Sequence, residues 1–209
     1  MRPELVEAIL AADVDPTEPV VPAGDPARHL DHDALVAGLR KLNSPRDRGR
    51  LALMVARDEA HGRATPTRVR LQAGLALPGD RWQPSPRSGL KSQFATMELG
   101  VAEVVCNGQS ITLTGDNLIV DLDLSPENLP VGSLLAIGGA RLVVTDKAHT
   151  GCKKFRQRFG RDALLLTAHP DWRHRRLRGL FLQVEQDGEV EVGDTIEVLR
   201  RGPEPGAEA

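Results

Sequence analysis

Short apolar segments separated by turn residues are the feature that most limits how this chain can fold. Each segment spans four to six residues, which is the length of a strand and too short for an ordinary helix. Turn residues such as Gly138-Gly139 separate them and permit positive φ. The pattern predicts a mainly β fold, and many short strands with tight turns favour a β-barrel. The segments are residues 51–56, 68–71, 93–97, 118–122, 134–137, 140–145, 179–184 and 194–199.

A few segments have the periodicity of helices instead. Residues 3–12 begin with a proline and predict a short helix. Residues 31–42 predict a second helix, which Asp31 or Asp33 can cap. Residues 99–105 predict a third helix that buries the neighbouring Cys106. In residues 161–168 three leucines are contiguous, so periodicity does not separate a helix from a strand there.

Length and composition indicate one domain with additions at both ends. We expect a helical extension over residues 1–45, a β-barrel over 46–200 and a disordered tail over 201–209. Two cysteines do not make a disulfide framework, which favours a reducing, cytoplasmic setting. No apolar run approaches the ~20 residues of a membrane span, so we expect no membrane association.

Residues 147–178, which read KAHTGCKKFRQRFGRDALLLTAHPDWRHRRLR, hold the strongest functional signal. Phe155 and Phe159 have helix spacing, so we place Cys152 at the start of a helix. The helix dipole and the neighbouring cations favour the thiolate there, which is the form that acts as a nucleophile or a metal ligand. His149 is a candidate to tune this thiol or relay a proton, although pairing with the backbone is equally open.

The same stretch is strongly basic. It contains ten Lys or Arg and two acids, whereas the whole chain has a net charge of −2. Such asymmetry favours an anionic partner, although a solvated surface would also explain it. Arginine can bind phosphate in a bidentate manner, which makes the arginines of residues 173–178 the best placed for a phosphate group. The candidate binding residues are Lys153, Lys154, Arg156, Arg173, Arg175, Arg176 and Arg178.

The segment HTGCKKFRQRFG at residues 149–160 resembles the signature of MOSC domains, which are named for the C-terminal domain of molybdenum cofactor sulfurases. The resemblance covers roughly residues 50–200 and implies a β-barrel with a few peripheral helices. It also implies that the loop with Asp80 and Arg81 borders a cofactor pocket, to which Asn117 could contribute. For these three residues, turn chemistry is the alternative. Further motifs on both sides of this segment fit the family in order: GDRW at 79–82, GDNL at 115–118, RGLF at 178–181 and VGD at 192–194.

The resemblance implies a protein that binds the molybdenum cofactor (molybdopterin) or carries sulfur for one. Cys152 could ligate molybdenum for a redox reaction, such as reduction of N-hydroxylated compounds, with a redox partner protein. Alternatively, Cys152 could carry a persulfide from a sulfur donor for assembly of the molybdenum cofactor or a metal–sulfur cluster. The family also occurs beside pyridoxal phosphate-dependent domains, but no lysine here stands in a Schiff-base setting.

A non-catalytic module that docks an acidic partner through its basic face is the reading from a different class. Such a module does not require an activated thiol, so Cys152 argues against it. Nucleic acid is not an expected partner, because few aromatic residues stand among the basic ones.

Overall fold

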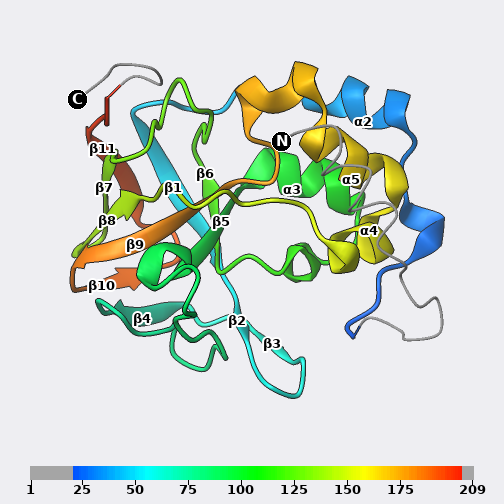
Figure 1. The fold of residues 1–209 in the computed structure, drawn as a ribbon. Helices are drawn as coiled ribbons and strands as arrows, with labels where there is room; N and C mark the ends of the chain where they lie inside the picture. Colours follow the sequence, from blue (N-terminus) through cyan, green and yellow to red (C-terminus); the bar gives the residue numbers. More distant parts are fainter. Residues whose placement is uncertain (1–20, 204–209) are drawn as a thin grey trace.

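The structure is a computed structural model that describes residues 21–203 (Figure 1). The helix expected over residues 3–12 lies outside the described residues, as does most of the tail. In the described part, none of the helices is long and apolar enough to cross a membrane.

Seven strands close into a barrel, which confirms the predicted fold class. All neighbouring pairs are antiparallel except β5 and β6, which are parallel. A parallel pair needs a crossover connection, and α3 (Leu99–Cys106) with the 3-10 helix η3 (Ile111–Thr114) supplies it. Around the barrel the order is β1 (Arg48–Met54), β11 (Thr195–Arg200), β7 (Leu134–Ile137), β8 (Ala140–Val144), β9 (Leu180–Gln186), β5 (Phe94–Glu98) and β6 (Leu118–Asp121).

Two small sheets extend from one end of the barrel (Figure 1). One is the hairpin of β2 (Ala56–Arg57) and β3 (Arg63–Ala64), and the other pairs β4 (Arg68–Leu71) with β10 (Gly188–Glu191). The sequence did not predict β10.

The helices cluster along one side of the barrel (Figure 1). Asp31 caps α2 as predicted, because its side chain accepts from the Ala34 N–H at 2.8 Å. Residues 161–168, which periodicity left undecided, form α5. The remaining elements are η1 (Pro26–Arg28), α2 (His32–Leu39), η2 (Leu90–Ser92), α4 (Lys153–Phe159), α5 (Arg161–Ala168) and η4 (Pro170–Arg175).

Strand alternation divides the apolar residues between two cores. In β6, Leu118 and Val120 face the barrel interior, while Ile119 between them faces the helices. The helical core includes Phe155 and Phe159, both 1% exposed and packed edge to face at 4.9 Å. These two phenylalanines hold α4 against the barrel, and thereby set the position of Cys152.

Candidate functional site

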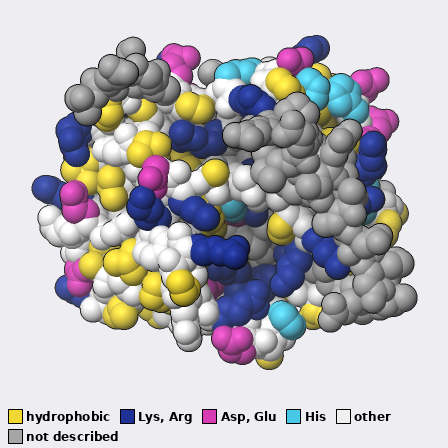
Figure 2. Space-filling view, in the orientation of Figure 1, with side chains coloured by type: hydrophobic (Ala, Val, Ile, Leu, Met, Phe, Trp, Pro, Cys, Tyr) yellow, Lys and Arg dark blue, Asp and Glu magenta, His cyan; other side chains and the backbone are white. Residues whose placement is uncertain are grey.

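A cavity of about 220 Å³ lies beside Cys152, and we call it the Cys152 cavity. Figure 2 shows Lys and Arg side chains gathered around a hollow between the barrel and the helices. Its wall combines six basic side chains with Cys152 and neutral residues that include His149, Thr150 and Phe181. The basic residues that line it are Arg57, Arg63, Arg81, Lys154, Arg158 and Arg178.

Cys152 stands where the sequence placed it, at the N-terminus of α4. Its side chain is exposed, and its carbonyl accepts the first helical hydrogen bond, from the Arg156 N–H at 3.1 Å. The preceding Gly151 allows the loop to approach α5, because a Cβ there would lie 2.3 Å from a methyl carbon of Leu164. The other thiol, Cys106, is buried as expected, and burial raises its pKa to about 12.

His149 is the second predicted residue of the site, and it lies over a buried ion pair. Arg178 Nη1 donates to both carboxylate oxygens of Asp116, at 3.0 and 2.8 Å. His149 Nε2 lies 3.6 Å from Asp116 Oδ1, and its ring packs on Phe181 at 4.5 Å. Burial, reinforced by the charge of Arg178, lowers the pKa of His149 well below its usual value, so the imidazole is neutral.

Two polar atoms of this network have no partner among the described residues. They are Nδ1 of His149 and Nε of Arg178, and both are buried. The side chains are 9% and 8% exposed, and both line the Cys152 cavity. Because buried polar groups are normally hydrogen-bonded, this part of the wall is suited to a polar ligand.

The predicted residues Asp80 and Asn117 have buried side chains, which orient Arg57. Arg57 donates from Nε and Nη2 to Asp80, at 2.8 and 3.0 Å, and from Nη2 to Asn117 Oδ1 at 3.0 Å. Burial alone would raise the pKa of Asp80, but the hydrogen bonds and charge of Arg57 hold it below its usual value. Asp80 thus pairs with Arg57 and not with the adjacent Arg81, whose side chain lines the cavity.

Arg158 is a cavity residue that sequence analysis missed. Its side chain donates to the carbonyls of Leu113, Pro22 and Val21, at 2.9, 3.0 and 3.3 Å. The residue is 4% exposed, and burial, followed by repulsion from Arg63, lowers its pKa to about 10. The helix periodicity could have predicted this, because Arg158 lies four residues after Lys154, a candidate binding residue, and residues four apart share a helix face.

Some basic residues of the stretch line neighbouring cavities. Arg173, Arg176 and Arg178 line a cavity of about 350 Å³ with Trp172, which we call the Trp172 cavity. It shares His149, Thr150 and Arg178 with the Cys152 cavity. Arg176 Nη1 donates to the carbonyls of Leu124 and Leu129, at 3.1 and 2.8 Å.

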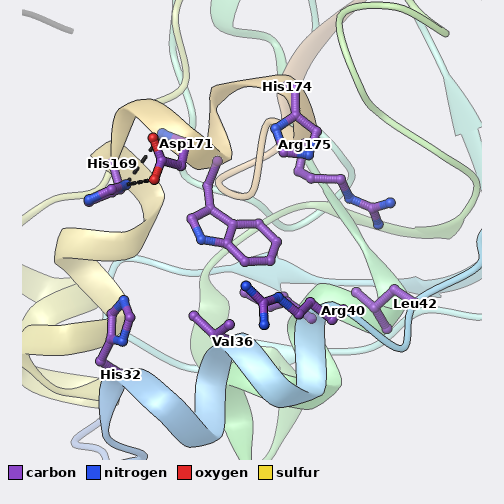
Figure 3. A pocket seen from close by; sticks show the side chains of 10 residues that line it. His32, Val36, Arg40, Leu42, His169, Asp171, His174 and Arg175 are labelled. Atoms are coloured by element: carbon purple, nitrogen blue, oxygen red, sulfur yellow. Dashed lines mark hydrogen bonds and ion pairs between the residues drawn. The ribbon is translucent and has the colours of Figure 1, made fainter.

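Arg175 does not line the Cys152 cavity. It pairs with Glu98 at 3.2 Å and lines a third cavity, between α2 and η4, of about 430 Å³. Figure 3 shows this cavity, where dashed lines join His169 and Asp171. Lys153 and Arg156 line none of the three cavities. Of the predicted binding residues, Lys154, Arg81 and Arg178 therefore meet at Cys152.

The donor set at Cys152 fits a metal that arrives with its own ligands. Within residues 21–203, no three His, Cys, Asp or Glu side chains are placed to hold a metal ion together. The cavity offers one exposed thiol, a neutral imidazole with an unpartnered nitrogen, and a cationic wall. These groups suit an anionic, metal-bearing cofactor, because the thiolate is a soft ligand and the arginines can bind phosphate. Its one lysine, Lys154, stands among arginines, and nothing in the cavity supports a pyridoxal phosphate link.

Comparison with protein families gives a match to the MOSC domain over residues 98–197, which include Cys152. Comparison with curated proteins gives no match. Three solved structures are similar at 16–19% identity, which shows a shared fold. The YUAD protein from Bacillus subtilis is 16% identical with a TM-score of 0.51, over 72% of this chain and 95% of that chain. YiiM from Escherichia coli is 19% identical with a TM-score of 0.51, over 73% and 71%. A hypothetical protein is 18% identical with a TM-score of 0.53, over 74% and 70%.

Proposed function

Because this chain carries a MOSC domain, a family linked to molybdenum cofactor-related proteins, we propose that it binds a molybdenum–pterin cofactor at the Cys152 cavity. The observation that carries the proposal is an exposed thiol beside a wall of six cations. None of the described residues lining this cavity is an acid. In this proposal Cys152 ligates the metal, and the protein catalyses a redox reaction such as reduction of N-hydroxylated compounds, supplied with electrons by a partner protein.

The residues divide the work by their chemistry. The cations of the cavity bind the phosphate of the pterin, and Asp80 and Asn117 hold Arg57 in place for this contact. The bound cofactor supplies a redox-active metal, for which the Cys152 thiolate is a soft ligand. Asp116 favours the proton of His149 on Nε2, which leaves Nδ1 as an acceptor toward a substrate.

A second candidate is a sulfur carrier, which the exposure of Cys152 supports. The Cys152 thiolate would attack the outer sulfur of a donor persulfide, and the donor thiolate would leave. The resulting Cys152 persulfide is reversible and would pass its sulfur to an acceptor in cofactor or cluster assembly. The docking module for an acidic partner is the weaker candidate, because the cations line a cavity rather than an open face.

Metal and pterin analysis tests the first proposal. Protein from a host that makes the cofactor should contain molybdenum and pterin in equal amounts. Cys152→Ser should lose metal, because a hydroxyl is a poorer, harder ligand, whereas the buried-thiol control Cys106→Ser should keep it. Metal retained by Cys152→Ser would refute ligation. A reductant-labile sulfur on Cys152 without bound pterin would support the carrier instead.

A further inference from the structure

The Cys152 cavity holds more positive charge than one phosphate group requires. Six cationic side chains line it, and two carboxylates pair with them: Asp80 with Arg57, and Asp116 with Arg178. The excess is four positive charges. A phosphate monoester carries about −1.5 to −2 at neutral pH, so one such group leaves roughly half of the excess unmatched.

Two of these cations, the buried Arg158 and the half-buried Arg63, have no carboxylate partner within ion-pair distance among the described residues. Arg158, 4% exposed, donates to neutral carbonyls, and Arg63 does the same, to His61 and Gly62. The Nε of Arg63 is also buried without a partner. Burial and then repulsion from Arg81 and Arg57 lower the pKa of Arg63, although the more weakly acting charges of Asp80 and Asp58 oppose this shift. Since burial of an uncompensated charge is costly, these positions indicate that a ligand supplies the counter-charge.

The cations come from two different parts of the fold. Arg57 and Arg63 stand on the β2–β3 hairpin, and Arg81 lies in the loop after β4, where its N–H donates to the Arg57 carbonyl at 2.8 Å. Lys154 and Arg158 stand on α4, a separate element that lines the same cavity. Each group has enough charge for one phosphoryl group of its own.

We propose that the Cys152 cavity takes two phosphoryl groups at once, one beside the hairpin and one beside α4. The inference rests on the proposed cofactor site for the identity of the ligand, but not for its phosphate chemistry. The two groups could come from one diphosphate-bearing ligand. They could also come from the cofactor phosphate and a phosphorylated substrate, because the adjoining Trp172 cavity shares His149 and Arg178 with this one.

Calorimetric titration of the full chain without cofactor tests the proposal, with inorganic phosphate and pyrophosphate as probes. We expect one pyrophosphate per chain, bound at least about tenfold more tightly than phosphate, and two phosphates per chain. Arg63→Gln should weaken pyrophosphate binding at least about tenfold. The matched control Arg70→Gln removes an exposed arginine that pairs with Glu189 on β4–β10, and should change nothing. One phosphate per chain with no preference for pyrophosphate, or equal behaviour of the two variants, would overturn the proposal.

The ratio of phosphorus to pterin in the cofactor-loaded protein separates the two sources. Two phosphorus atoms per pterin indicate a diphosphate form of the cofactor. One phosphorus per pterin, with a further phosphate bound on titration, indicates a separate phosphorylated ligand. One phosphorus per pterin with no further phosphate bound overturns the proposal while leaving the cofactor site intact. Pyrophosphate binding by a protein that never retains pterin would instead refute the cofactor site alone.

Discussion

Replacement of Arg178 by methionine removes the cation on which the centre of the site is built. Asp116 has no exposed side-chain surface, and Arg178 is its only charged partner within hydrogen-bond distance among the described residues. A buried ion pair broken on one side typically costs about 3–5 kcal/mol, because the remaining charge is uncompensated. Against a total stability of about 5–15 kcal/mol for a domain, such a loss is readily measured.

Urea unfolding followed by tryptophan fluorescence is a suitable assay. Arg178→Met should lower the free energy of unfolding at pH 7 by about 3–5 kcal/mol. The double variant with Asp116→Asn should recover much of this loss, since it removes the stranded carboxylate as well. As a control, Arg68→Met removes an exposed partner of Glu191 and should leave the urea midpoint unchanged.

The pH dependence gives the result that would refute this reasoning. Burial raises the pKa of Asp116, and without Arg178 it should rise further, so the folded variant takes up a proton that the unfolded chain does not. The stability of Arg178→Met therefore falls as pH rises. Its loss of unfolding free energy relative to wild type should shrink by up to about 1.4 kcal/mol per pH unit as pH falls from 7 toward 4. A deficit below about 1 kcal/mol that does not change with pH would show that Asp116 does not depend on this ion pair.

Three further predictions concern reactivity, pH and backbone geometry. At pH 8 iodoacetamide should alkylate Cys152 at least a hundredfold faster than Cys106, because only about one part in ten thousand of Cys106 is thiolate. Equal rates by mass spectrometry would exclude Cys152 as the working thiol. As pH is lowered past about 6.5, the wild type should lose stability relative to His149→Gln by up to about 1.4 kcal/mol per pH unit, because the unfolded histidine binds a proton that the buried one does not. Parallel curves of stability against pH would contradict a buried neutral imidazole. Gly179→Ala should lower the free energy of unfolding in urea by about 2–4 kcal/mol, because φ is +81° and a Cβ would lie 1.9 Å from a carbonyl oxygen of β5. The control Gly193→Ala, at φ +99° in open space, should cost less, and equal costs would contradict the close contact.

The barrel strands and the place of the thiol followed from local sequence, whereas β10 and the helical form of residues 161–168 did not. Alternating apolar residues and glycine turns predicted the barrel strands, and helix spacing of Phe155 and Phe159 predicted that Cys152 begins a helix. The apolar surroundings of Cys106 likewise predicted its burial. These features depend on neighbours within a few residues along the chain, so they can be read without tertiary contacts. The division into a helical extension and a barrel domain stays a prediction.

Only the tertiary structure decided which charged residues meet at Cys152. Arg57 lies at a strand end that local pattern treats as a boundary, yet the fold brings it to Asp80 and Asn117, which stand 23 and 60 positions further along the chain. Arg175 and Arg178 lie three residues apart in one basic run, yet they line different cavities. Local sequence sets the direction of a side chain relative to its own element, whereas its partner depends on how distant elements pack. A count of charges therefore located the basic region. Which of its residues belong to the site depends on the closed barrel and on the packing of α4 against it.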